Sequence, residues 1–84
     1  MNKDQRQKAW NEGKTIIRPQ WSERYNAWMI KRYSITGGWK LYSANTFSSL
    51  QECEAIVDVL VRDHLDIIKD FGTLPEPAAP SPPG

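Results

Sequence analysis

The stretch from Ser48 to Asp70 constrains the fold more than any other part of this chain, because apolar residues recur in it at helical spacing. These positions cover about half of a helix circumference and are Leu50, Cys53, Ile56, Val57, Leu60, Val61, His64, Leu65, Ile67 and Ile68. Two serines precede the pattern, and Gln and Glu follow them three residues later, as in a capping box. Gly72 and Pro75 then stop it. The sequence therefore predicts one long C-terminal helix over Ser48–Asp70.

The length of the chain, 84 residues, suits one small domain with a marginal core. Four tryptophans partly offset the small size, because each one brings a large area that can be buried. Residues 73–84 are rich in proline and cannot build a core. We therefore expect a single α+β domain over residues 1–72 and a disordered Pro-rich tail over residues 73–84.

Cys53 is the only cysteine, so no disulfide can form within the chain. A reduced compartment fits this composition best. The sequence has neither a signal-peptide pattern nor an apolar run that could span a bilayer. We expect a cytoplasmic protein that does not bind membranes.

The residues before the long helix predict a small antiparallel sheet. Met1–Glu12 is polar and predicts a short N-terminal helix or an ordered arm, which Gly13 ends. Thr15–Trp21 has the β-branched residues of a strand. Proline cannot donate a hydrogen bond to a neighbouring strand, so Pro19 predicts that this strand lies on an edge of the sheet.

Ala27–Ile35 and Trp39–Ala44 predict a hairpin, because Gly37 and Gly38 between them suit a tight turn. A two-residue loop places Trp28, Ile30, Trp39, Leu41 and Phe47 on one face and Lys31, Tyr33, Lys40 and Tyr42 on the other. A three-residue loop groups Met29, Tyr33, Ile35, Trp39 and Leu41 instead, with Arg32, Lys40 and Tyr42 opposite. We favour the two-residue loop, because Phe47 then extends a face that leads into the helix.

The predicted architecture is a two- or three-stranded antiparallel sheet packed on one long helix. At 1.5 Å per residue that helix would be roughly 35 Å long, whereas a six-residue strand spans about 20 Å. Part of its apolar face would then extend beyond the sheet. The N-terminal segment would cover this part, or a second copy of the chain would do so in a homodimer.

Charge is distributed unevenly, although the formal net charge is only +1. Nine lysines and arginines lie before Leu50 with three acidic residues, whereas two basic and seven acidic residues follow. One half of the molecule should be basic and the other acidic. The ordinary interpretation is two solvated faces, and the sharper one is that the asymmetry affects the choice of partner.

No group of residues in the sequence forms a recognisable catalytic motif. His64 is the only histidine, lies on the predicted apolar face, and has no nucleophile one helical turn away. We interpret it as a core or interface residue. One histidine and one cysteine cannot supply the four ligands of a structural zinc site. The expectation is a protein that is not an enzyme and has no cofactor and no metal.

Cations alternate with aromatic residues on the predicted hairpin, and such a face suits base stacking and phosphate binding. The residues concerned are Lys31, Arg32, Tyr33, Lys40 and Tyr42. The segment from Trp28 to Ile56, about a third of the chain, also resembles the arm-type, AP2-like DNA-binding domains of phage integrases. The motifs that carry the resemblance are Trp28-Met29-Ile30-Lys31-Arg32-Tyr33, Gly37-Gly38-Trp39, Thr46-Phe47-Ser48-Ser49 and Glu52-Cys53-Glu54-Ala55. The resemblance implies a small sheet that enters the DNA major groove, with a helix behind it.

The interpretation we favour is a small interaction protein, a regulator or inhibitor of the kind that phages and other mobile elements encode, which binds a larger protein complex. The polar side of the long helix offers the binding residues, namely Asp58, Val59, Arg62 and Asp66. Asp58 and Arg62 are four residues apart and are predicted to form an ion pair. The alternative is a nucleic-acid-binding module that uses the basic aromatic face of the hairpin.

Overall fold

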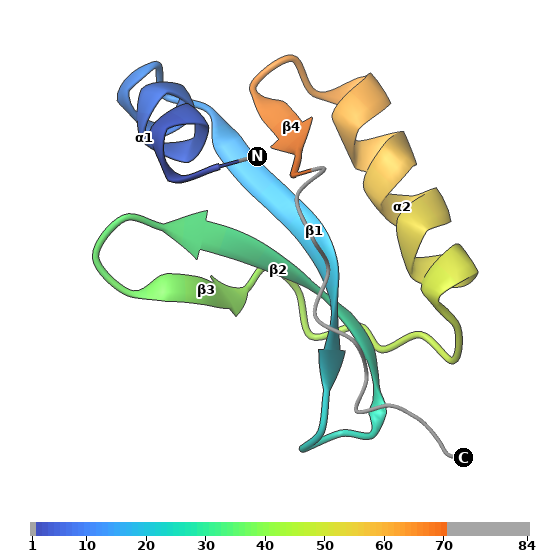
Figure 1. The fold of residues 1–84 in the computed structure, drawn as a ribbon. Coiled ribbons are helices and arrows are strands. Elements are labelled where there is room, and N and C mark those ends of the chain that lie inside the picture. The colour runs from blue at the N-terminus through green and yellow to red at the C-terminus, as the bar shows by residue number, and fades with distance from the viewer. Residues whose placement is uncertain (1, 71–84) are drawn as a thin grey trace.

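A computed structural model describes residues 2–70, which form a small α+β fold with two helices and a four-stranded mixed sheet (Figure 1). The elements in chain order are α1 (Lys3–Asn11), β1 (Thr15–Ser22), β2 (Ala27–Ser34), β3 (Gly38–Leu41), α2 (Leu50–Asp63) and β4 (Ile67–Lys69). The predicted tail, residues 73–84, lies outside the described residues. The fold class is therefore confirmed, but the predicted strand count is wrong.

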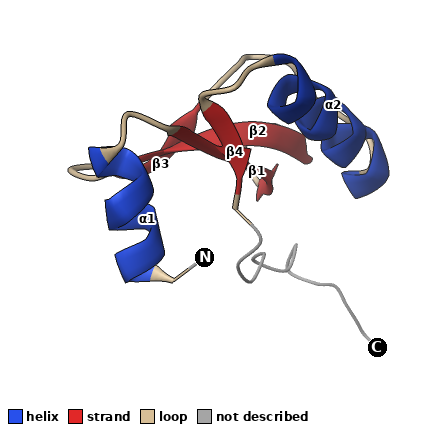
Figure 2. Cartoon of the chain, turned by 90° about the horizontal axis from the view of Figure 1, so that it is seen from above, coloured by secondary structure: helices blue, strands red, loops and turns tan. Residues whose placement is uncertain are grey.

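The strands are ordered β3-β2-β1-β4, with antiparallel pairs between β3, β2 and β1. β4 pairs with β1 in parallel. Helices α1 and α2 lie on opposite faces of this sheet (Figure 2). The sheet is thus the middle layer of the molecule.

Helix α2 begins as predicted and ends earlier than predicted. Ser49 is the N-cap, and its hydroxyl accepts a hydrogen bond from the Glu52 backbone N–H. The helix ends at Asp63, and His64 already has an extended backbone. Ile67 and Ile68, which we assigned to the helix, instead pair with β1. β-branched residues pack well in a strand, and this strand places the Ile67 side chain in the core.

Helix α2 is shorter than the long strands β1 and β2 on which it packs. Fourteen residues span about 21 Å, which is less than the length of the eight-residue strands β1 and β2. The prediction of an overhanging helix is therefore wrong. A second copy of the chain is therefore not needed to cover an overhang.

Of the two alternatives for the N-terminal segment, a short helix or an ordered arm, the structure shows the helix. Asn2 caps α1 in a complete capping box, because its side chain accepts from the Gln5 N–H and the Gln5 side chain accepts from the Asn2 N–H. Gly13, with φ of +79°, ends the helix and leads into β1.

Pro19 is accommodated in β1 although this strand lies between two others. It is opposite Ile30, whose carbonyl accepts from the Tyr42 N–H on the β3 side. Backbone groups of one antiparallel residue point to one side, so Pro19 has its nitrogen directed away from β2. On that side β4 reaches only as far as Ile17. The predicted edge position is thus wrong for the first part of β1, which pairs with both β2 and β4. Pro19 itself lies beyond the residues that pair with β4.

The hairpin register differs from the one we favoured. Ser34 pairs with Gly38, so the loop has three residues, Ile35–Gly37, and Gly38 follows with φ of +72°. Glycine adopts this left-handed conformation without steric cost. The side-chain faces therefore match the alternative that we left open, in which Arg32 and Lys40 lie opposite Trp39.

The core lies between α2 and the sheet. Its buried members come from β1, β2, α2 and β4 and are Ile17, Trp28, Ile30, Cys53, Val57 and Ile67. Trp21 packs edge-on against Trp28, with ring centroids 5.7 Å apart. Every other strand residue therefore faces α2, and the residues between them face α1.

Candidate interaction surfaces

Helix α2 presents an exposed surface on the side that faces away from the sheet. Cys53 and Val57 are fully buried against the strands, so residues on the opposite side of the helix point outward. We call this surface the α2 outer face, and its exposed residues are Gln51, Glu52, Ala55, Ile56, Asp58, Val59, Arg62 and Asp63.

The α2 outer face carries two large aliphatic side chains. Ile56 is 41% exposed and Val59 is 37% exposed, and residues three apart on a helix are neighbours. Leu65, in the loop that follows the helix, is 94% exposed. A single exposed valine is ordinary. Here two exposed aliphatic side chains, Ile56 and Val59, are adjacent, and the almost fully exposed Leu65 follows the end of the helix.

Three of the four residues predicted to bind a protein lie on this face, and the fourth follows it. Asp58, Val59 and Arg62 are on α2, and Asp66 is in the loop before β4; all four are exposed. The predicted Asp58–Arg62 ion pair is wrong. Arg62 is 3.3 Å from Asp63, and Asp58 is 3.4 Å from the Lys69 ammonium.

Ile56 and Leu65 were missed as surface residues, because helical spacing assigned them to the buried face. A warning was present in the sequence: the apolar positions covered about half of the helix, whereas one sheet buries a stripe of roughly 100°. The excess apolar width had to lie outside the core.

The five residues of the basic aromatic set do not share one face. Arg32 and Lys40 are exposed on the α2 side of the hairpin, with half-buried Tyr42 packed against the core. Lys31 and Tyr33 occupy the alternate positions and face α1. The Tyr33 ring meets Trp39 edge-on at 5.5 Å and lies 5.7 Å from the Arg6 guanidinium, so it is not an open stacking surface.

The residues considered for chemistry lie apart from one another. His64 is exposed at the end of α2, so it is not a core residue. Cys53 is fully buried, and burial raises the pKa of its thiol to about 11. Within residues 2–70, no group of three or more His, Cys, Asp or Glu side chains is placed to hold a metal ion.

Neither described helix is long and apolar enough to cross a membrane. Comparisons with protein-family models, with curated proteins and with solved structures give no match for this chain.

Proposed function

We propose that this protein is a small cytoplasmic interaction protein without catalytic activity, which binds and regulates a larger protein complex through the α2 outer face. One observation carries the proposal: Ile56 and Val59 are adjacent and exposed on a helix that already buries its opposite side against the sheet. Leu65 extends the exposed aliphatic surface past the end of the helix.

The charges around these side chains indicate the chemistry of the partner. Carboxylates at both ends of α2 and in the following loop surround the aliphatic pair, with Arg62 as the one cation on the outer face. The exposed ones are Glu52, Asp58, Asp63 and Asp66. A helix with aliphatic anchors three residues apart suits an apolar groove. Charge complementarity then requires basic side chains along the rim of that groove.

A site-specific cross-linking experiment tests the proposal. A photo-reactive amino acid placed at Val59 should capture one discrete partner in an extract of the cells that encode the protein. The same group at Asn45, which is exposed in the loop before α2, is the control and should not capture that partner.

Substitution on the same face supplies the decisive comparison. Ile56→Glu with Asp63→Lys should abolish the Val59 cross-link, because one change puts a charge in the apolar groove and the other repels a basic rim. Glu23→Lys, in the exposed turn between β1 and β2, should leave it intact. Equal capture from Asn45 and Val59, or capture unaffected by the α2 changes, would contradict the proposal.

A second candidate function has one supporting observation. Arg32 and Lys40 are exposed partners across β2 and β3, so two cations lie together on the hairpin. Such a pair can contact nucleic-acid phosphates. The alternative of nucleic-acid binding then involves Arg32 and Lys40 directly, whereas Tyr33 and Tyr42 are engaged in packing.

A further inference from the structure

Helix α1 contributes little apolar surface to the fold. Ala9 is its only buried residue, Arg6 is half-buried, and the other residues of the helix are exposed, including Trp10 at 37%. Most of the large Trp10 side chain is nevertheless covered, so Ala9 and Trp10 give α1 a small apolar contact with the rest of the fold. Polar contacts add to this attachment.

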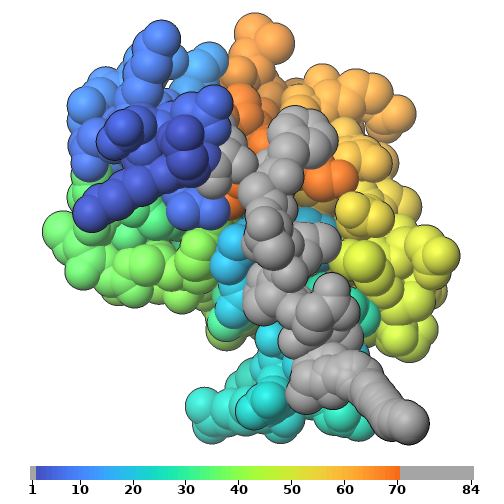
Figure 3. Space-filling model, viewed as in Figure 1, coloured from blue at the N-terminus to red at the C-terminus, as the bar shows by residue number. Residues whose placement is uncertain are grey.

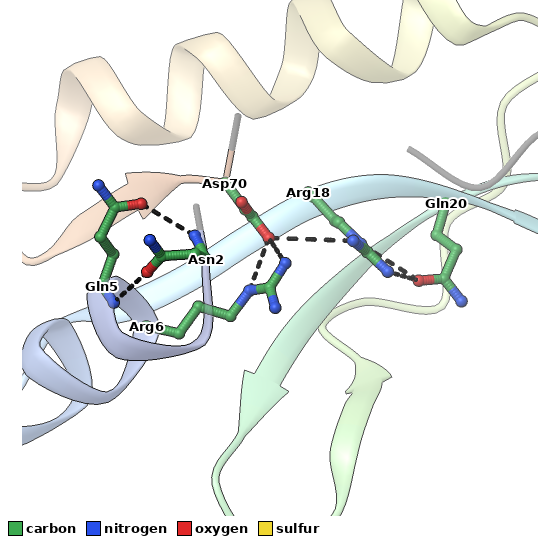
Figure 4. A network of polar contacts seen from close by, with 6 residues as sticks. All are labelled: Asn2, Gln5, Arg6, Arg18, Gln20 and Asp70. Carbon is green, nitrogen blue, oxygen red and sulfur yellow. Dashed lines mark hydrogen bonds and ion pairs between the residues drawn. The ribbon is translucent and has the colours of Figure 1, made fainter. Parts of the chain in front are cut away.

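Those contacts converge on one buried carboxylate (Figure 4). The Arg6 guanidinium donates to Asp70 Oδ2 through Nε at 3.0 Å and places Nη2 2.9 Å from the same oxygen. The Asp70 side chain is fully buried, and Arg18 Nη1 of β1 is 3.9 Å from it. Arg6 thus joins α1 to the residue that directly follows β4.

The same two arginines lie over aromatic rings on the α1 side of the sheet. Arg18 is 4.0 Å from the centroid of the Trp39 ring and donates to Gln20. Arg6 is 5.5 Å from the Trp39 centroid and 5.7 Å from that of Tyr33. Cation–π contacts of this kind are attractive without being tight. The guanidinium of Arg6 is therefore the principal polar attachment of α1 to the sheet.

Asp70 retains a cationic neighbour when Arg6 leaves. Burial lowers the pKa of Arg18, while Asp70 acts in the opposite direction, and an arginine stays protonated in proteins. An open state with α1 detached would thus leave the carboxylate beside Arg18 and not as an isolated buried charge. Local opening is favoured where few apolar contacts hold a segment.

We propose that α1 is a releasable cover, fastened by the Arg6–Asp70 ion pair, which opens while the sheet and α2 stay folded. Opening uncovers a cationic aromatic surface formed by Arg18, Tyr33 and Trp39. This inference does not depend on the partner of the α2 outer face, because the surface concerned is on the opposite side of the sheet.

Amide hydrogen exchange followed residue by residue by NMR tests the cover in the intact chain. In the unaltered protein, the α1 amides should exchange at least about tenfold faster than those of β1, β2 and α2. Arg6→Gln should accelerate α1 exchange by a further tenfold or so, the change expected on losing one hydrogen bond to a charged group. The exchange of the sheet and α2 amides should change by less than about twofold, the range in which surface substitutions away from packed features fall.

Lys8→Gln is the matched control, because Lys8 is an exposed cation on the same helix. It should change α1 exchange by less than about threefold, the size expected for one charge near a helix end. The indole N–H of Trp39 supplies a second signal, which should shift in Arg6→Gln and not in Lys8→Gln. The proposal is overturned if α1 exchanges at the rate of β1, if Arg6→Gln accelerates all elements equally, or if both variants behave alike.

Discussion

The side chain of Asp70 lies under α1 with two arginines around it. In the sequence it is one of seven acidic residues after Leu50, with nothing to distinguish it from the exposed ones. Its partner Arg6 is 64 positions away. Only the order of the strands brings them together, so no local pattern could have predicted this contact.

Replacing this carboxylate should destabilise the protein far more than replacing an exposed one. Asp70→Ala leaves Arg18 buried without its counter-charge, and breaking a buried pair in this way lowers the free energy of unfolding by about 3–5 kcal/mol. Asp63→Ala removes only the exposed contact with Arg62 and should change it by less than about 1 kcal/mol. Urea denaturation of both variants measures the difference. Similar midpoints for the two would show that the Asp70 pair does not stabilise the fold.

The thiol of Cys53 should be almost inert in the folded protein. It is fully buried, and burial raises its pKa to about 11, so the reactive thiolate is scarce at pH 8. A coloured disulfide reagent should therefore react at least about a hundredfold faster in denaturant, where the thiol pKa returns to about 8.5. The same shift means that stability falls as the pH rises from about 9 toward 11, because the unfolded thiol ionises first. Rapid labelling of the native protein would contradict this burial.

At the scale of helices and strands, the features that could be predicted are those set by residues close together in the sequence. The cap of α2 and the hairpin follow from short-range signals at Ser49 and the two glycines. The N-terminal helix was one of two alternatives, and the capping box at Asn2 that decides for it was not recognised. The end of α2 did not follow, because Ile67 and Ile68 fit a helix pattern and a strand equally well. Pairing with β1 decides between them, and this pairing is a tertiary contact.

The residues of the α2 outer face and of the hairpin could also be predicted only in part. The exposure of Asp58, Val59 and Arg62 followed from their place opposite the apolar face. The exposure of Ile56 did not, because periodicity alone cannot say how wide a stripe the sheet will bury. The split of the hairpin residues between two faces also required the register, which a turn with two consecutive glycines leaves open.

Two neighbouring residues of α2 test which side of the helix packs on the sheet. Val57→Ala removes two buried methyl groups and should lower the free energy of unfolding by about 1.5–3 kcal/mol. Ile56→Ala shortens an exposed side chain and should change it by no more than about 0.5 kcal/mol. Thermal and urea melts of both variants provide the values. A larger loss for Ile56→Ala than for Val57→Ala would contradict the orientation of α2.

The end of β4 connects the helices on the two faces of the sheet. Lys69 points toward α2, where its ammonium is 3.4 Å from both Glu54 and Asp58. The next residue, Asp70, points toward α1 and binds Arg6. This follows from the alternation of side chains along an extended chain. The three-residue strand β4 thus contacts α2, and the residue that directly follows it contacts α1.

At the scale of the whole molecule, the uneven charge of the sequence becomes an arrangement in space. Helix α1 and the β2–β3 hairpin lie on one side of the molecule and α2 on the other (Figure 3). The first group carries the exposed cations Lys3, Lys8, Arg32 and Lys40. The second carries most of the exposed carboxylates after Leu50. Partner choice can therefore be tested separately on the two sides.

Salt dependence separates the two candidate functions. If the hairpin binds nucleic acid, affinity must fall steeply as salt rises, because each neutralised phosphate releases a condensed counterion. Arg32→Ala and Lys40→Ala should then each lower the salt slope by about one unit, and Asp58→Lys should not weaken binding. Fluorescence anisotropy with a labelled 20-base-pair duplex provides these values over a salt series.

We expect the other pattern, because only Arg32 and Lys40 of the predicted set are exposed together. Two phosphate contacts support no more than the non-specific range, with dissociation constants of about 10⁻⁴–10⁻⁶ M at physiological salt. Capture of the partner at Val59 should meanwhile be lost with Asp58→Lys and unchanged in Lys40→Ala. Duplex binding tighter than about 10⁻⁷ M that Lys40→Ala removes, together with partner capture indifferent to Asp58→Lys, would replace protein binding by nucleic-acid binding as the function of this chain.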